Sequence, residues 1–359
     1  MKIALNCTSC DADHRDTERI KHPKSRDGFI DSVKIYACVL VVLGHFIQSM
    51  TTASILEETF FVQWFNKTIY YFHVPLFFIC SGYLYQKYSK VNSFSQWKSN
   101  VLKKVVSLGI PYFVFSIITW IMKSVFSSSV NNEVDGFFET LFLNPIAPYW
   151  YLYALFFLFS ITLTFNSKKS AIFLLIVALA LKFVSFTSFE CGIYAIQTIL
   201  SNEIWFVFGM CISYFKLNRL CGNKKMLFVA VALAIAFVVS SIFVYAYHIS
   251  YGLVAFSLGV IACVSTMIFA IYFESSKFSD LLNSKLYKYT LPVFLMHTIF
   301  AAGIRAVLFK LSIVNSFVHI VAGISISFMG PIVAAIVMSK VKYLDFILYP
   351  NKYIFKKKG

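Results

Sequence analysis

Long apolar runs separated by short polar stretches repeat along almost the whole chain. A helix that crosses the hydrocarbon core of a bilayer needs about 20 predominantly apolar residues, and roughly ten runs suit that length. The predicted fold is therefore an all-α polytopic membrane protein with about ten transmembrane helices. They are expected at residues 31–51, 64–86, 101–126, 147–165, 170–188, 193–215, 226–247, 251–273, 287–309 and 316–339.

Basic residues are concentrated before the first run, after the last run and in every second loop between them. Cytoplasmic loops of membrane proteins carry an excess of Lys and Arg, so the pattern predicts that both termini are cytoplasmic. An even number of spans, such as ten, follows from this placement. The basic positions include Arg15, Arg19, Lys21, Lys24, Arg26, Lys87, Lys90, Lys98, Lys168, Lys169, Lys216, Arg219, Lys224, Lys225, Lys277, Lys285, Lys340, Lys342 and Lys352.

The composition excludes a soluble enzyme with a single membrane anchor. The chain is 59% hydrophobic and 13% charged, whereas an average soluble domain has about 25% charged residues. We expect a polar, disordered N-terminal cytoplasmic tail over residues 1–26, one membrane domain over residues 27–345 and a basic cytoplasmic tail over residues 346–359. The net charge of +16 is assigned to membrane topology, and no nucleic-acid partner is expected.

The eight cysteines do not indicate a disulfide framework, because most of them fall inside apolar runs, where cysteine behaves as a small hydrophobic residue. Cys7, Cys10 and His14 are ligand types that zinc accepts, but they are a weak signal beside the alternative of a polar tail. We expect neither a metal site nor a permanently bound cofactor. The first 26 residues lack the apolar core of a signal peptide, so insertion is expected to rely on the first span.

Two histidines lie within the first two apolar runs. His45 follows Lys34 by eleven residues, which in a helix places both on nearly the same face and His45 about 16 Å farther along the axis. The second predicted helix runs back, so His73 near its start reaches a similar depth. Ionisable side chains inside a bilayer cost free energy and are usually retained for function. The pair favours a reaction site in the membrane, and hydrogen bonding between helices is the alternative.

A neutral imidazole accepts a proton near pH 7, which suits a general base for a sugar hydroxyl that attacks an acyl thioester. The sequence has no Gly-x-Ser-x-Gly elbow and no recognisable Ser–His–Asp order. Direct attack by the acceptor hydroxyl, or a transient acyl-histidine, is therefore favoured over an acyl-serine intermediate.

Other ionisable residues also fall within predicted spans. Glu203 is expected at outer depth, where it would orient a histidine or bind a sugar hydroxyl. His297 and Arg305 are either substrate-binding groups or a buried structural pair. Lys182 is given no role, because a lysine can extend its ammonium group to the membrane interface.

Lys103 and Lys104 stand at the cytoplasmic start of the third run. With Lys34 they form a candidate cationic pocket for a nucleotide phosphate, although the ordinary enrichment of cytoplasmic loops in lysine explains the same pattern. Tyr149 and Trp150 follow the longest outer loop. Their rings are candidates to stack on a sugar, with an interfacial aromatic belt as the alternative.

These residues together resemble acyltransferase family 3, whose members are integral-membrane O-acyltransferases of bacterial surface polysaccharides. In the first helix of that family, ten residues separate a basic residue from a histidine, as they separate Lys34 from His45. The second helix reads Phe-His-x-Pro-Leu-Phe-Phe-x-x-Ser-Gly-Tyr, and the resemblance covers about residues 27–340. The residues that match this second-helix motif, or other motifs of the family farther along the chain, are Phe72, His73, Pro75, Leu76, Phe77, Phe78, Ser81, Gly82, Tyr83, Lys104, Pro111, Tyr112, Trp150, Phe206, Gly209 and His297.

The resemblance implies a multi-pass enzyme of the bacterial inner membrane. Its donor would be acetyl-CoA or another short acyl-CoA from the cytoplasm, and its acceptor a sugar hydroxyl of a surface glycan or of the lipid-linked precursor. It implies a general base at His45 with support from His73, and donor binding by Lys34 and Lys104. Lys34 and Ser107 stand where the family often has arginine, and a lysine cannot form the bidentate contact that arginine makes with phosphate.

A secondary transporter that exports a glycan or a small solute is the alternative function, because ten spans with embedded charges suit it. Against it, the sequence shows no internal repeat, no paired helices broken by Gly or Pro, and few acidic residues for proton coupling. A non-catalytic sensor or assembly partner is a third, weaker alternative. The expected partners are acyl-CoA, a glycan and membrane lipids; the sugar, the acyl group and the oligomeric state do not follow from the sequence.

Overall fold

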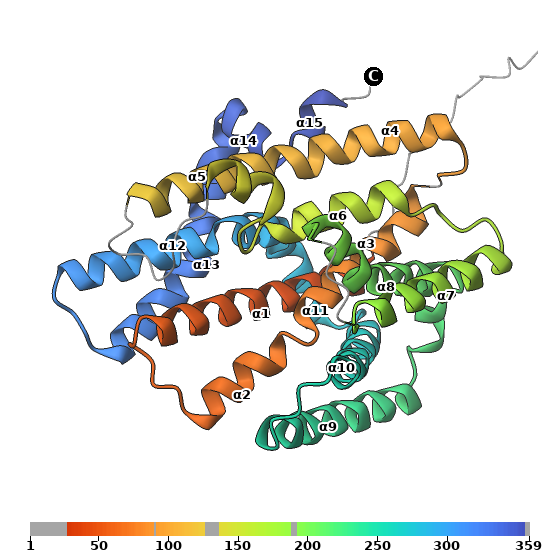
Figure 1. Ribbon diagram of the computed structural model, residues 1–359, viewed down its shortest axis with the longest axis horizontal. Coiled ribbons are helices and arrows are strands. Elements are labelled where there is room, and N and C mark those ends of the chain that lie inside the picture. The colour runs from red at the N-terminus through yellow and green to blue at the C-terminus, as the bar shows by residue number, and fades with distance from the viewer. Residues whose placement is uncertain (1–26, 90, 126–135, 188–191, 356–359) are drawn as a thin grey trace, which may run out of the picture.

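A computed structural model describes residues 27–89, 91–125, 136–187 and 192–355 (Figure 1). Every regular element within these ranges is helical, which confirms the all-α prediction. The candidate zinc ligands Cys7, Cys10 and His14 lie outside the described residues. The α-helices are α1 (Gly28–Thr52), α2 (Phe60–Ile69), α3 (His73–Tyr88), α4 (Phe94–Lys104), α5 (Ile110–Val125), α6 (Trp150–Ile161), α7 (Lys168–Val184), α8 (Tyr194–Tyr214), α9 (Lys224–Ala246), α10 (Gly252–Tyr272), α11 (Lys277–Lys285), α12 (Thr290–Lys310), α13 (Ser316–Lys340), α14 (Lys342–Leu348) and α15 (Asn351–Ile354).

Seven helical stretches in the described part of the chain are long and apolar enough to cross a membrane. All ten predicted runs contain helix, but α3, α6 and α7 have only 16, 12 and 17 residues, so the count of ten and the cytoplasmic termini stay predictions. The seven stretches are Gly28–Thr52, Phe94–Val125, Tyr194–Tyr214, Lys224–Ala246, Gly252–Tyr272, Tyr287–Lys310 and Ser316–Lys340.

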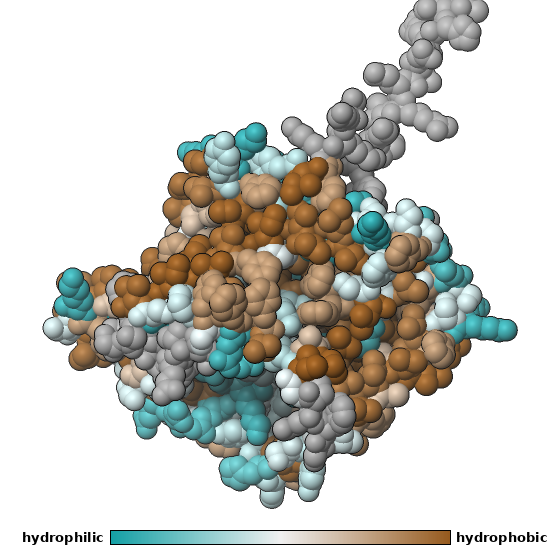
Figure 2. All heavy atoms as spheres, turned by 45° about the horizontal axis from the view of Figure 1, so that its top comes forward, coloured by the Kyte–Doolittle hydropathy of each residue, from teal (hydrophilic) through white to brown (hydrophobic). Residues whose placement is uncertain are grey.

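Large apolar side chains cover much of the outer surface of the helices, as the space-filling view of one face shows (Figure 2). Phe173 on α7, Phe228 on α9 and Phe317 on α13 are 65%, 74% and 72% exposed. Soluble monomers rarely expose apolar patches of more than a few hundred Å². An outward-facing apolar surface is what a lipid-embedded bundle requires, and the chain is a multi-pass membrane protein.

The predicted helix at residues 64–86 is wrong as a single helix, because the chain breaks between Ile69 and His73. The last turn of α2 closes with hydrogen bonds from Tyr71 N to Thr68 O and from Phe72 N to Ile69 O, each 3.2 Å long. Pro75 accounts for the break, because a proline inside a continuous helix removes one hydrogen bond and its ring clashes with the carbonyl four residues before it. The break makes His73 the first residue of α3.

Helix α1 is central, and its contacts fix the direction of its neighbours. Cys38 and Ser49 of α1 contact Thr290 and Arg305 of α12, so these two helices run parallel. The ring of Phe29 contacts Tyr83 and the ring of Tyr36 contacts Phe72, so α1 and α3 run antiparallel. These directions are the ones that alternating membrane crossings require for the first, second and ninth predicted spans.

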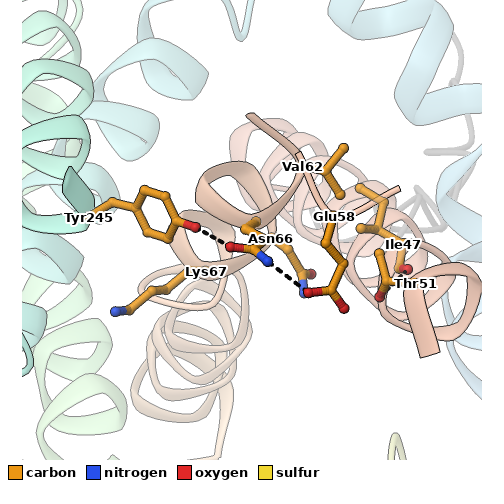
Figure 3. A pocket seen from close by; sticks show the side chains of 8 residues that line it. Ile47, Thr51, Glu58, Val62, Asn66, Lys67 and Tyr245 are labelled. Atoms are coloured by element: carbon orange, nitrogen blue, oxygen red, sulfur yellow. Dashed lines mark hydrogen bonds between the residues drawn. The ribbon is translucent and has the colours of Figure 1, made fainter. Parts of the chain in front are cut away.

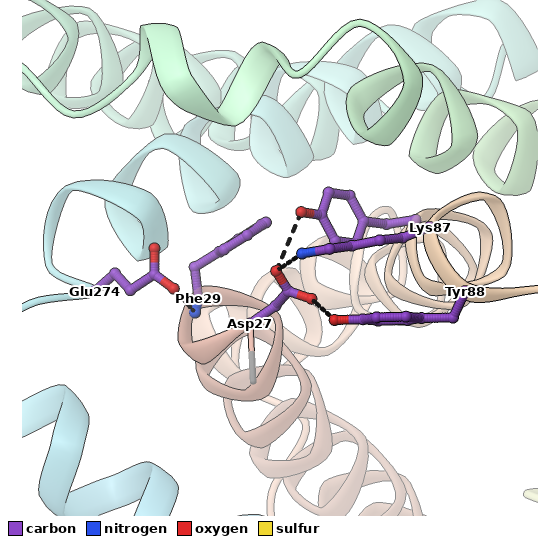
Figure 4. A network of polar contacts seen from close by, with 6 residues as sticks. Asp27, Phe29, Lys87, Tyr88 and Glu274 are labelled. Atoms are coloured by element: carbon purple, nitrogen blue, oxygen red, sulfur yellow. Dashed lines mark hydrogen bonds and ion pairs between the residues drawn. The ribbon is translucent and has the colours of Figure 1, made fainter. Parts of the chain in front are cut away.

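The start of α1 is anchored by a polar network (Figure 4). The carboxylate of Asp27 accepts hydrogen bonds from Tyr83, Lys87 and Tyr88, all from the last two turns of α3. On the other side, Phe29 N donates to Glu274 Oε1 at 3.2 Å. The first turn of α1 is therefore joined to α3 and to the segment that follows α10, which fixes the end of the helix that carries Lys34.

The C-terminal helices α14 and α15 are held together around Asp345, whose side chain is buried. Lys352 Nζ and Tyr353 OH both donate to Asp345 Oδ2. Burial alone would raise the pKa of Asp345, but the hydrogen bonds from Lys352 and Tyr353 outweigh it and hold this pKa below its usual value. Helix α14 also packs against α5 and α13.

Two glycines allow α3 and α8 to pack backbone against backbone. A Cβ atom at Gly82 would lie 1.9 Å from Phe206 O, and one at Gly209 would lie 2.0 Å from Ile79 O. The backbones of α3 and α8 thus touch directly, and small residues at such contacts are the usual means of bringing membrane helices together. Only glycine fits at either position.

Replacing Gly209 should therefore disrupt the bundle. Gly209→Leu places a side chain against the backbone of α3, and overpacking of this kind costs typically 1–3 kcal/mol, here without a flexible group that can yield. We expect a lower melting temperature and a smaller monodisperse fraction of purified protein. Gly303→Leu is the matched control, because a Cβ at Gly303 meets nothing within 4 Å. Equal stability of the two variants would contradict the packing described here.

Candidate active site

Three histidines from three helices form one cluster, in which Tyr70 contacts two of them and the third contacts His45. The rings of His45 on α1 and His297 on α12 have centroids 5.4 Å apart. Tyr70, in the turn between α2 and α3, presents its ring edge-on to His73 at 4.7 Å and to His45 at 6.4 Å. The structure thus brings His45 and His73 together as their spacing predicted. It adds His297, which the sequence placed only as a candidate substrate-binding residue.

Helix geometry explains how His297 reaches His45. The side chain of Arg305, two turns beyond His297, donates to the backbone oxygen of Ser49 at 3.1 Å and to the hydroxyl of the same residue. This contact clamps α12 alongside α1 near the end of α1. Arg305 therefore serves as a link between two helices, and the idea that it forms a buried pair with His297 has no contact to support it among the described residues.

The backbone determines which nitrogen of two histidines can act as a base. His73 Nδ1 lies 2.6 Å from Ile69 O, and His297 Nδ1 lies 3.0 Å from Val293 O. A carbonyl oxygen can only accept, so we assign the proton to Nδ1 in both rings, which leaves the lone pair on Nε2. His297 Nε2 is buried without a hydrogen-bond partner in the described part of the chain. Such an acceptor is suited to a substrate hydroxyl or to a water.

Access differs among the three rings. His73 and His297 are each 1% exposed, whereas His45 is partly exposed. His45 is therefore the most accessible residue of the three.

Two of the three predicted donor-binding lysines lie within range of each other's charge. The ammonium groups of Lys34 and Lys104 lie close enough for their charges to interact, and Lys104 Nζ lies 3.6 Å from the centre of the Phe159 ring. Both side chains are partly buried, whereas Lys103 is exposed. Like charges held together at a partly buried place repel each other until an anion joins them. This arrangement suits a phosphate bound by Lys34 and Lys104, and Lys103 is not part of that candidate pocket.

Glu203 forms no hydrogen bond or ion pair with a histidine in the described part of the chain. It is buried, and its Oε1 accepts a hydrogen bond of 2.7 Å from Thr162 Oγ1 just after α6. The Tyr85 hydroxyl donates to the carbonyl oxygen of the same threonine at 2.8 Å. The carboxyl group is thus held between α3, α6 and α8, which corrects the expectation that it orients a histidine.

Of the two aromatic residues predicted to stack on a sugar, Tyr149 is corrected, and the role of Trp150 stays a prediction. Tyr149 is fully buried, and its hydroxyl donates to Leu295 O at 3.0 Å and lies 2.9 Å from Thr119 Oγ1. Trp150 is partly buried against Phe78. A sugar cannot reach Tyr149 in this arrangement. Its contact with Leu295, two residues before His297, instead gives Tyr149 a role in placing α12.

Two features of this site were not predicted from the sequence. Tyr70 gave no signal beyond its place next to the family motif, because a tyrosine near a helix end is common in membrane proteins. The contact between His45 and His297 joins positions 252 residues apart, and spacing within one helix contains no information about such a pair. Within the described ranges, no three His, Cys, Asp or Glu side chains are arranged to hold a metal ion.

Comparison with known proteins identifies the family. Residues 27–336 match the family described as "Acyltransferase domain". The nodulation protein NolL of Mesorhizobium japonicum is 29% identical over 145 residues, which are 40% of this chain and 37% of that protein, so the chain matches well under half the length of this relative. No solved structure matches. The family match extends from the start of α1 through most of α13 and so includes Lys34, Lys104 and all three clustered histidines; this multi-pass membrane protein belongs to acyltransferase family 3.

Proposed function

We propose that the protein transfers a short acyl group, normally acetyl, from cytoplasmic acyl-CoA to a sugar hydroxyl of a surface glycan or its lipid-linked precursor. Family membership supports acyl transfer. The arrangement of residues along α1 supports the proposed donor and acceptor sites. Lys34 lies near Lys104 at one end of this helix, and His45 lies beside His297 and His73 farther along it. About 16 Å of helix separate the two groups, a gap that an extended CoA arm can follow.

In the proposed reaction, the acceptor hydroxyl attacks the thioester carbonyl carbon while His45 Nε2 or Nδ1 removes the hydroxyl proton. A new C–O bond forms, the C–S bond breaks, and the CoA thiolate takes the proton from the imidazolium as it leaves. The buried lone pair on His297 Nε2 accepts a hydrogen bond from the acceptor or from a water that holds it. His73 packs against the ring of Tyr70 and in this way helps to hold the histidine cluster in place.

At the donor end, Lys34 and Lys104 would bind CoA phosphates. The two ammonium groups repel each other in the free protein, so binding a dianion relieves repulsion as well as adding attraction. Charge-assisted hydrogen bonds of this kind contribute roughly 1.5–3 kcal/mol each. If the start of α1 is cytoplasmic, as the loop charges predict, this end meets the cellular pool of acyl-CoA.

The general-base role of His45 predicts the largest loss of activity. His45→Ala should lower kcat for acyl transfer by about 10²–10⁴-fold, the usual contribution of a general base, while the amount of protein in the membrane stays unchanged. Transfer of radiolabelled acetyl from acetyl-CoA to glycan by purified protein measures it. His319→Asn is the control, because His319 is a buried histidine that binds Ile313 O outside the cluster. Activity of His45→Ala within a few-fold of wild type would remove His45 from the mechanism.

The donor pocket predicts a difference between neighbouring lysines. Lys34→Gln should raise the KM for acyl-CoA about 10-fold or more, because one charge-assisted contact with phosphate is lost. Lys34→Arg should keep donor binding, since the charge remains and a bidentate contact is gained. Lys103→Gln, in an exposed position, should change little. A rise in the KM for the glycan with no change for acyl-CoA in Lys34→Gln would place the donor elsewhere.

The orientation of the site predicts reporter activity on each side of the membrane. Fusions at Asn132 should behave as extracytoplasmic, and fusions at Asn223 and Gly359 as cytoplasmic, as positive-inside loops require. Alkaline phosphatase and fluorescent protein reporters give opposite signals on the two sides. A C-terminal fusion that reads as extracytoplasmic would contradict this topology: it would mean an odd number of spans or, with an even number, a donor site that faces away from the cytoplasm.

A further inference from the structure

A polar pocket lies beside the end of α1, between that helix, α2 and α9 (Figure 3). Its volume is about 290 Å³, near the lower limit of roughly 300–1,000 Å³ for ligand pockets. That space suits one sugar ring rather than a chain of them. Six of the eight lining side chains carry a polar atom, in a protein that is 59% hydrophobic. They are Thr51, Glu58, Gln63, Asn66, Lys67 and Tyr245.

The polar side of the pocket is already ordered by its own hydrogen bonds. Gln63 Nε2 donates to Glu58 Oε2 at 2.7 Å, and the Tyr245 hydroxyl donates to Gln63 Oε1. Figure 3 shows Tyr245 reaching from α9 toward the α2 side chains, with Lys67 below it. Gln63 is thus fixed between two helices, and a ligand would meet a surface that needs little rearrangement.

One acceptor in the pocket has no partner. Asn66 Oδ1 is buried and makes no hydrogen bond within the described residues. A buried polar atom without a partner is destabilising, so it favours a ligand that donates a hydrogen bond. Hydroxyl groups do so, and side-chain amides, carboxylates and aromatic rings together are a common set of groups for holding a sugar.

The pocket does not open directly onto His45. Ile47, which lines it, follows His45 by two residues and therefore points about 200° away around α1. Between them stands Tyr70, whose ring faces His45 and whose hydroxyl donates to Gln48 Oε1 at 3.2 Å. A sugar in the pocket would thus lie next to the reaction centre but around the side of α1.

We propose that this pocket binds a sugar unit adjacent to the unit that is acylated, in an acceptor of two or more sugars. The inference rests on the proposed glycan acceptor and adds a second subsite to it. The acceptor chain would pass Tyr70, with one unit at His45 and its neighbour at Asn66, Lys67 and Tyr245. Binding energy from a remote unit can then position the reacting hydroxyl, which raises activity on longer acceptors.

A zwitterionic lipid headgroup is the competing occupant, because Glu58 and Lys67 supply one charge of each sign. The unpaired Asn66 oxygen favours the sugar, since it calls for a neutral hydroxyl donor beside the charges. The fixed Gln63 bridge also favours a rigid ring over a mobile headgroup.

The test uses the full-length protein in lipid nanodiscs with acetyl-CoA as donor. The acceptors are surface polysaccharide from a strain that lacks this gene, hydrolysed and separated into a monosaccharide fraction and an oligosaccharide fraction. Asn66→Leu should raise the KM for oligosaccharides about 10-fold, the value of one lost hydrogen bond to a buried group. It should leave the KM for acetyl-CoA and the rate on monosaccharides unchanged. Asn218→Leu, a partly buried asparagine beyond the far end of α8, should change neither.

Equilibrium binding of the oligosaccharide fraction, measured by calorimetry without donor, tests the subsite apart from turnover. Weaker binding to Asn66→Leu than to wild type supports the subsite even if no acyl transfer is detected, which would overturn only the proposed reaction. Equal losses on both acceptor fractions, or equal binding to both proteins, would overturn the subsite. So would mass spectrometry that finds one phospholipid retained by wild type and lost in Asn66→Leu.

Discussion

The parallel packing of α1 against α12 is the constraint on which the site depends. A polar group placed between these helices costs free energy when it has no partner, because no water is available in the hydrocarbon region to replace one. Arg305 has such a partner at Ser49, and Cys38 Sγ lies 3.6 Å from Thr290 O. These contacts fix the register of the two helices, and the register brings His297 to His45. Without it the cluster would lose one of its three rings.

A second constraint is the break between α2 and α3. Pro75 prevents a continuous helix, so the chain turns at Tyr70 and the new helix begins with His73. The turn places Tyr70 between His45 and His73, and it lets α2 pack beside the end of α1, where the polar pocket forms. One backbone break therefore shapes both the reaction centre and the proposed sugar subsite. Direct contact of α3 and α8 at Gly82 and Gly209 holds the new helix in place.

Some of this architecture follows from the sequence and some does not. Apolar length predicted the helices, and the interval from Lys34 to His45 placed both on one helix, because helical periodicity is a local property. The lysine pocket stays a prediction: Lys34 and Lys104 lie within range of each other's charge, while Lys103 is exposed. Glu203 and Tyr149 were misplaced because their surroundings come from other helices. The charges of the loops and the lengths of the apolar runs give no information about which helices pack against each other.

The central claim is that an acyl group passes along α1 from a donor at the Lys34 end to an acceptor at the His45 end. Proteoliposomes with the protein in one orientation test it directly, with radiolabelled acetyl-CoA outside and purified deacetylated glycan enclosed. When the Lys34 end of the protein faces outward, we expect radiolabelled acetyl groups on the enclosed glycan. When the orientation is reversed, we expect none. Label that appears only when donor and glycan share one compartment would contradict the central claim.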